Sequence, residues 1–270
     1  MNVKILKKWL VIVLLLSNIY VWHLIFEFYF LKSSVNFLNV FEGDSALIIN
    51  KSGNFLIDAG RRNYVSKPLS LMLPFFDNII DVVFVSHADS DHFEGLNYIL
   101  DNYKVRLVVL NDFENDNENY QKILKKIIDH NITIISGVSN TIVEGFGFKT
   151  EVLYPDISDL SLKSTNEKSQ VMLVNTVGKK ILFTGDITDK ILNKVVNKWD
   201  IENIDIIKIP HHGAKNTINR EILSQIGVKQ AVISVGDNNY GHPNTETLDL
   251  LKNFNIEVFR TDINGNISIK

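Results

Sequence analysis

The segment Ser86-His87-Ala88-Asp89-Ser90-Asp91-His92 follows a largely apolar run, residues 79–86, and precedes a run with helical spacing, residues 92–100. The first run predicts a buried strand and the second a helix, so four possible metal ligands lie in a loop at the carboxyl end of a strand. Imidazole and carboxylate groups suit Zn²⁺, and the additional carboxylates also suit Mn²⁺ or Fe²⁺. The alternative is a polar loop whose Asp residues cap the helix. So many acidic groups repel one another unless a cation lies among them, which favours a metal site.

Outward from this segment, short β-rich runs alternate with helical ones. The order predicts an α/β fold in which two mixed sheets pack face to face with helices outside, in four layers αββα. No linker rich in Pro, Gly or Ser divides residues 34–270, which are predicted to form one domain. Helices are predicted at residues 92–100, 119–130, 188–198, 219–226 and 244–253. Strands are predicted at residues 35–41, 46–50, 54–58, 79–86, 106–110, 132–135, 148–153, 170–176, 180–183, 204–209, 230–235, 256–260 and 266–269.

Three shorter motifs also lie at predicted strand ends: Thr184-Gly185-Asp186, Pro210-His211-His212-Gly213 and Gly241-His242-Pro243. Each alone has an ordinary structural explanation, as a turn, an incidental His pair or the start of a helix. However, five of the seven His residues fall at or just beyond predicted strand ends, together with the acidic cluster. Because sites assemble at strand ends in α/β folds, these motifs supply further candidate site residues.

The N-terminal segment, residues 1–33, is predicted to lie outside this domain. Lys4, Lys7 and Lys8 precede an apolar run from residue 9 to about residue 30, near the roughly 20 residues with which a helix spans a bilayer. The basic flank predicts a single-pass anchor in the cell membrane with an extracellular domain. A cleaved signal peptide and secretion are the alternative, although the run is longer than a usual signal segment and no Ala-x-Ala-like site follows it. A buried helix of a soluble protein is a third interpretation.

The composition is that of a folded protein, with 45% hydrophobic and 22% charged residues. A net charge of -3 gives no general attraction to polyanions, so nucleic-acid binding would need a local basic patch. The chain has no cysteine, so any metal site must use His, Asp and Glu. No obligate protein partner is evident from the sequence.

The order of these motifs resembles the metallo-β-lactamase superfamily, and within it the exported hydrolase domain of ComEC-like competence proteins. The motif His87-x-Asp89-x-Asp91-His92 matches the metal motif of that group, in which Asp89 replaces the second His of most superfamily members. The resemblance runs from about Val35 to the C-terminus. Its other segments are residues 39–45, 56–60, 182–186, 209–214 and 234–243, followed by a terminal strand pair at residues 260–262 and 265–267.

The resemblance implies a site with two divalent metal ions, Zn²⁺ or Mn²⁺. The chain departs from the superfamily at residues 166–169, Asn166 to Ser169, where most members have another His, so full occupancy of the first metal position stays open. The implied ligands are His87 and Asp89 for one ion, Asp91 and His92 for the other, Asp186 bridging both, and one of His211 and His212 completing the second site.

Asp91 and His242 are the predicted catalytic residues. The resemblance implies that His242 faces the substrate, as a hydrogen-bond donor to an oxyanion or as an acid for the leaving group. Two ions about 3.5–4 Å apart would lower the pKa of a bridging water, which serves hydrolysis of phosphodiesters, lactams, thioesters and lactones alike.

The carboxylate-rich ligand set favours phosphodiester hydrolysis, and the resemblance suggests DNA as the substrate, with a role in DNA uptake or processing. The same His-x-Asp-x-Asp-His motif is similar to that of surface phosphorylcholine esterases, which act on cell-wall teichoic acids. A hydrolase of β-lactams or other small molecules stays open as an alternative. A catalytically impaired binding module is a further alternative, because a lost ligand could abolish the chemistry.

Overall fold

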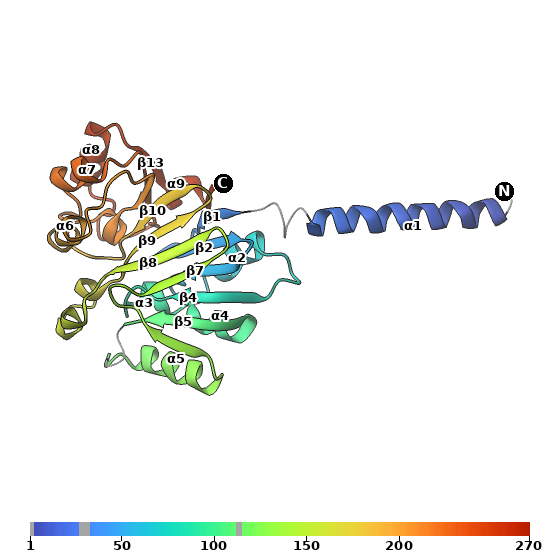
Figure 1. The fold of residues 1–270 in the computed structure, drawn as a ribbon, viewed down its shortest axis with the longest axis horizontal. Helices are drawn as coiled ribbons and strands as arrows, with labels where there is room; N and C mark the ends of the chain where they lie inside the picture. Colours follow the sequence, from blue (N-terminus) through green and yellow to red (C-terminus); the bar gives the residue numbers. More distant parts are fainter. Residues whose placement is uncertain (1–2, 27–32, 112–114) are drawn as a thin grey trace.

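The computed structural model describes residues 3–26, 33–111 and 115–270. Within them the chain forms two mixed seven-stranded sheets that pack face to face, with helices on both outer surfaces (Figure 1). The four-layer αββα architecture predicted from the sequence is confirmed. The end of the predicted N-terminal apolar run, residues 27–30, lies outside the described residues.

The first sheet has the order β14-β1-β2-β3-β4-β5-β6. β3 to β6 are parallel, whereas β1, β2 and β14 join by antiparallel pairing. The strands are β1 (Ser34–Phe37), β2 (Ala46–Asn50), β3 (Gly53–Ile57), β4 (Ile79–Phe84), β5 (Lys104–Leu110), β6 (Thr133–Ser136) and β14 (Ile267–Ile269). The helices that follow its strands are α2 (Ser66–Met72), α3 (Ser90–Phe93), α4 (Leu96–Asn102) and α5 (Glu118–Asp129).

The second sheet has the order β13-β12-β11-β10-β9-β8-β7. β10 to β13 are parallel, and β7 to β10 are antiparallel. The strands are β7 (Ile142–Gly145), β8 (Phe148–Tyr154), β9 (Val171–Thr176), β10 (Lys179–Phe183), β11 (Ile206–Lys208), β12 (Gln230–Ile233) and β13 (Glu257–Arg260). The helices of this half are η2 (Ile157–Ser161), η3 (Asn166–Lys168), α6 (Asp189–Lys198), η4 (Pro210–Gly213), α7 (Arg220–Ile226), α8 (Thr245–Asn253) and α9 (Thr261–Asn264).

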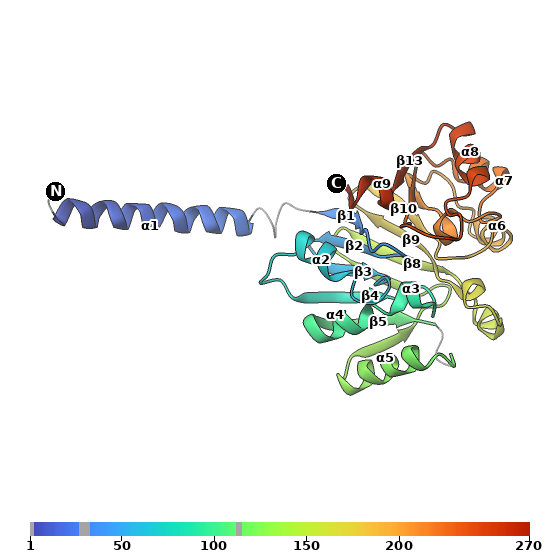
Figure 2. The ribbon, with the colours of Figure 1, turned by 180° about the vertical axis from the view of Figure 1, so that it is seen from behind.

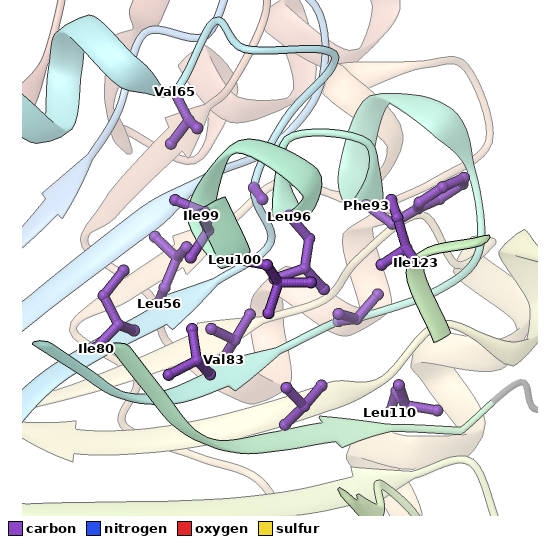
Figure 3. Packing of buried hydrophobic residues seen from close by; sticks show 14 of the residues in the cluster. Leu56, Val65, Ile80, Val83, Phe93, Leu96, Ile99, Leu100, Leu110 and Ile123 are labelled. Carbon is purple, nitrogen blue, oxygen red and sulfur yellow. The ribbon is translucent and has the colours of Figure 1, made fainter. Parts of the chain in front are cut away.

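Both faces of each sheet are covered, which is why many strands are continuously apolar. Along β2, Leu47 and Ile49 pack with the helical layer, whereas Ala46 and Ile48 face the other sheet, as the two-residue period of a strand requires. On the helical side, residues of α4 such as Leu96 pack against the sheet (Figure 3). The sheets are therefore held apart and aligned by a separate apolar layer between them.

Two predicted elements differ from the structure. The predicted helix at residues 92–100 is divided into α3 and α4, because the N–H of Gly95 donates to the carbonyl of Gly60 at 2.9 Å instead of to the preceding helical turn. A Cβ on Gly95 would lie 2.0 Å from the carbonyl oxygen of Ala59, so this close approach requires glycine. Both predicted terminal strands are present, as β13 in the second sheet and β14 in the first, but residues 261 and 262 of the terminal segment lie in the helix α9. The short helix α9 carries the chain between the sheets, and Thr261 anchors it through hydrogen bonds with the backbone of Val235.

The helix α1 (Val3–Phe26) extends away from the two sheets, and none of its residues is buried (Figure 2). Among the described residues it is the one helix that is long and apolar enough to cross a membrane, with a mean hydropathy of 2.1. A signal sequence would meet the same criterion.

Candidate metal centre

Three segments that are distant in the sequence meet where the parallel strands of both sheets end. His87 follows β4, His92 lies in α3, Asp186 follows β10, and His212 lies in η4 after β11. All four side chains are buried, and Nε2 of His92 and of His212 lie 3.3 and 3.5 Å from Oδ2 of Asp186. Nε2 of His87 lies 4.0 Å from the same oxygen. Three imidazoles thus surround one carboxylate, as strand-end assembly predicts.

The predicted aspartates beside these residues join the cluster from its more open side. Oδ2 of Asp91 lies 3.3 Å from Nε2 of His212, and Oδ2 of Asp89 lies 3.7 Å from Nε2 of His87. Two ligand atoms that each lie about 2.1 Å from one tetrahedral ion are about 3.4 Å apart, so these spacings suit divalent cations.

The ring nitrogens supply a direct test of fit. Nε2 of His87, of His92 and of His212 is buried without a hydrogen-bond partner in the part of the chain that the structure describes. Such buried groups are costly unless something binds them. Possible ligand atoms lie within 4.8 Å of one another in two groups that share His92. One group is His87, His92 and Asp186, and the other is Asp91, His92 and His212. The residues present therefore fit a metal centre.

The other ring nitrogen of each His is held by a neighbouring oxygen. Nδ1 of His92 lies 3.0 Å from Oδ2 of Asp58. Nδ1 of His212 lies 2.8 Å from the carbonyl oxygen of Ser234, and Nδ1 of His87 lies 2.9 Å from Oγ of Ser86. Donation from Nδ1 to the carboxylate and to the carbonyl leaves the Nε2 lone pairs of His92 and His212 free for a metal.

Sequence reasoning did not assign a role to Asp58. Its Oδ1 accepts a hydrogen bond from the Ser86 backbone at 2.7 Å, so one carboxylate fixes both the metal-motif loop and the ring of His92. The available signal was its position as the last residue of a predicted strand, in the segment at residues 56–60.

A buried cation that sequence reasoning also missed lies behind the cluster. The side chain of Lys208 is 2% exposed, and its ammonium forms an ion pair with Asp44 and lies 3.6 Å from Oδ1 of Asp186. The signal was a lysine inside the otherwise apolar run Ile206-Ile207-Lys208-Ile209. A Cβ on Gly43 would lie 1.7 Å from the Asp91 carbonyl oxygen, so the turn that presents Asp44 requires glycine.

The segment at residues 166–169, where the sequence departs from the superfamily, lies beside the cluster. Ser169 is buried, and its Oγ accepts a hydrogen bond from the Asp186 backbone at 3.2 Å. The preceding Thr165 donates a hydrogen bond from Oγ1 to Oδ1 of Asp89. The segment thus orients two candidate ligands through hydroxyl groups in place of a further imidazole.

The neighbours His211 and His212 are separated by the backbone of η4. Both have positive φ, 49° and 53°, a conformation that non-glycine residues seldom adopt and that is common at functional sites. Only His212 belongs to the groups of possible ligands. The ring of His211 instead lies 5.6 Å from the ring of His242, with which it lines a pocket.

His242 is fixed through its backbone. Its N–H donates to Oδ1 of Asn238 at 3.1 Å, and its carbonyl accepts from Nδ2 of Asn238 at 2.7 Å. Asn238 is a further residue that sequence reasoning did not identify. The open pocket in front of the cluster measures about 250 Å³. It is lined by Glu42, Gly43, Arg61, Asp89, Ser90, Asp91, Asp186, His211, His212, Val235, Gly236, Asn238, Tyr240 and His242.

The charges of the cluster shift its pKa values in opposite directions. Burial would raise the pKa of Asp186, but His92, His212 and Lys208 hold it well below its ordinary value. Burial would lower the pKa of His212, but Asp186, Asp44 and Asp91 raise it to about 10. The metal-free cluster therefore binds protons at neutral pH on nitrogens that a divalent cation would need.

We expect the metal-free protein to lose stability as the pH rises from 6.5 to about 10. His212 has an ordinary pKa of 6.5 and a folded pKa of about 10, so its proton stabilises the fold fully below pH 6.5, and this contribution is lost through pH 10. Urea unfolding in EDTA at pH 6, 8 and 10 measures this. The variant His212→Gln should show a flatter dependence, and identical slopes for both proteins would contradict the expectation.

Comparison with known proteins agrees with the fold. Residues 38–139 match the family model for the metallo-beta-lactamase superfamily. The chain is 29% identical over 259 residues to ComE operon protein 3 of Bacillus subtilis, and 25% identical over 240 residues to Recombination protein 2 of Haemophilus influenzae. These alignments cover 88% and 87% of the chain but 33% and 28% of those proteins, so the chain spans about a third of their length.

Among solved structures, the metallo-beta-lactamase fold protein YhfI from Bacillus subtilis superposes with a TM-score of 0.58 at 14% identity. That comparison covers 88% of this chain and 100% of YhfI. The resemblance and the fold that the sequence predicts are confirmed.

Proposed function

Because this chain carries a metallo-beta-lactamase domain that is homologous to ComE operon protein 3, we propose that it is a metal-dependent phosphodiesterase that acts on DNA. The observation that carries the proposal is the set of three buried Nε2 atoms without hydrogen-bond partners, 3.3–4.0 Å from one carboxylate oxygen of Asp186. Such a set has little structural purpose without a cation.

In this proposal two divalent ions, Zn²⁺ or Mn²⁺, would be held by the predicted ligands. His87 and Asp89 would hold one ion and Asp91 and His92 the other, with Asp186 as a further ligand. His212 rather than His211 would complete the second set, since its Nε2 lies 3.3 Å from Asp91. Ions held there would lower the pKa of a water molecule and offset negative charge on a phosphodiester.

The protein's own residues then position the substrate. Burial, His211 and His212 lower the pKa of His242, so its neutral ring donates a hydrogen bond to a phosphoryl oxygen at neutral pH. Asp91 lines the pocket, where its carboxylate would accept a hydrogen bond from the attacking water. Arg61 also lines the pocket, where its charge is paired with that of Glu42. The divalent ions and the hydrogen bond from His242 would favour an anionic substrate over a neutral lactam.

We propose the division into an anchor, residues 1–33, and a hydrolase domain, residues 34–270. The helix α1 would then cross the cell membrane once and hold the domain outside the cell, where it meets imported DNA. The apolar and wholly exposed surface of α1 supports this location.

The decisive experiment uses the full chain in nanodiscs, stripped with EDTA and reloaded with Mn²⁺ or Zn²⁺. We expect cleavage of single-stranded or double-stranded DNA only after reloading. Release of phosphorylcholine from teichoic acid without DNA cleavage would assign the cell-wall esterase instead. Turnover of nitrocefin alone would overturn the phosphodiesterase proposal. Two bound metal equivalents without hydrolysis of any ester would indicate a binding module.

His242→Ala is expected to lower the rate of DNA cleavage by about 10²–10³-fold, the usual effect of removing one hydrogen-bond donor to a developing charge. Two metal equivalents should stay bound, because His242 does not contact the ligand cluster. Metal content by mass spectrometry and the cleavage rate together test this. The exposed His130→Ala is the matched control. Loss of metal from His242→Ala would show that its role is wrongly assigned.

A further inference from the structure

Exposed apolar side chains gather at the edge of the sheets where β3, β4 and β8 begin. We call Leu71, Phe75, Phe76 and Phe146 the apolar edge; Phe75 is 97% exposed, Phe146 75% and Leu71 67%. Phe75 and Phe76 contact each other edge to face, with ring centroids 5.2 Å apart. Soluble surfaces seldom expose several large apolar side chains together unless something covers them.

Contacts between the loops show that this edge is one surface. Ser52, in the turn between β2 and β3, donates a hydrogen bond from Oγ to the Phe146 carbonyl at 2.8 Å. Asn54, at the start of β3, donates to Asp77 in the loop that carries Phe75 and Phe76. The β2–β3 turn therefore joins the loop before β4 to the turn between β7 and β8.

The chain enters the domain at this same edge. Ser34, the first residue of β1, pairs with Ile49, two residues before the β2–β3 turn. The loop between α2 and β4 lies on the side of the domain toward α1 in both views, whereas η2 lies on the far side (Figures 1 and 2). The candidate metal centre lies at the opposite, carboxyl ends of β3 and β4.

The short connection to α1 restricts what can cover the apolar edge. Residues 27–33 join α1 to β1, and seven residues span at most about 25 Å when fully extended. A bilayer crossed by α1 must therefore lie close to the edge at which β1 begins.

The charged groups at this edge are of both signs: Glu144 is exposed two residues before Phe146, and the half-buried Asp77 accepts a hydrogen bond from Asn54. Lys51 is exposed beside the Phe146 ring, 5.8 Å from its centroid, whereas Asp81 is neutralised by Arg106 at 2.6 Å. An exposed lysine attracts anionic headgroups, and apolar side chains bury themselves in the boundary below them.

We propose that the apolar edge inserts into the interface of the bilayer that α1 spans, so that the candidate metal centre faces away from the membrane. The proposal rests on the proposed membrane anchor. It gives the domain a fixed orientation, in which the pocket is open to polymers that approach from outside.

The absence of cysteine allows a direct test with single-cysteine variants of the full chain. Phe75→Cys and Phe146→Cys report on the apolar edge, and Val13→Cys reports on α1. Ile157→Cys in η2 is the matched control, because Ile157 is 76% exposed and η2 follows the carboxyl end of β8, away from the edge at which β8 begins. Each variant is spin-labelled and placed in vesicles of phosphatidylcholine and phosphatidylglycerol. Collisions of the label with oxygen and with a water-soluble nickel chelate are then measured.

We expect labels at positions 13, 75 and 146 to collide more with oxygen, and the label at 157 to collide more with the chelate. A lipid-exposed label at 13 with water-exposed labels at 75 and 146 would overturn the orientation while leaving the anchor intact. A water-exposed label at 13 would overturn the anchor, and the orientation with it. Lipid exposure at all four positions would also overturn the orientation.

Discussion

Under the proposed function, Asp186→Ala is expected to remove both metal ions and to lower DNA hydrolysis by at least about 1,000-fold, because the ions would supply both the attacking water and the stabilisation of charge. Oδ2 of Asp186 is the atom around which the three imidazoles converge. Metal content and the rate of cleavage of a labelled oligonucleotide measure the effect.

Asp249→Ala, on the exposed face of α8, is the control for Asp186→Ala and should retain metal and rate. A circular dichroism spectrum establishes that the Asp186 variant is folded. The assignment of Asp186 fails if the folded variant still binds two equivalents of metal.

Lys208→Met is expected to destabilise the metal-free protein by about 3–5 kcal/mol, the usual cost of removing one partner from a buried ion pair. Burial lowers the pKa of Lys208, but Asp44 and Asp186 raise it above its ordinary value, so the side chain is a cation at neutral pH. Its removal takes from two buried carboxylates, Asp44 and Asp186, the ammonium that they share, and leaves His212 as a cation near both. Urea unfolding in EDTA measures the free-energy change.

Two comparisons separate the charge of Lys208 from its packing. Lys180→Met removes an exposed lysine from β10 and should leave stability nearly unchanged. The double variant Lys208→Met with Asp44→Asn removes both charges of the pair and should recover part of the loss. If Lys208→Met unfolds like Lys180→Met, the buried ion pair does not stabilise the protein.

Much of the fold could be predicted because it depends on local patterns. The apolar run before His87 and the turn residues after it define a strand end whatever the rest of the chain does. The alternation of strands and helices then limits the fold to layered α/β arrangements. The sheet to which β14 belongs could not be predicted, since a short apolar strand has the same pattern in either sheet. Its partner β1 lies more than two hundred residues away.

The sequence by itself determined the chemistry available to the site: imidazoles and carboxylates, without thiolates, at the ends of strands. Only the tertiary structure decided which of these groups face one another. The packing of the sheets buried Lys208 and Asp44 together and turned Asp58 onto the ring of His92. His211 and His212 are adjacent and chemically identical, yet the backbone of η4 brings only the ring of His212 into a group of possible metal ligands, while both rings line the pocket. At this site the direction and burial of each side chain follow from contacts between distant segments, so a local pattern of residues could not predict them.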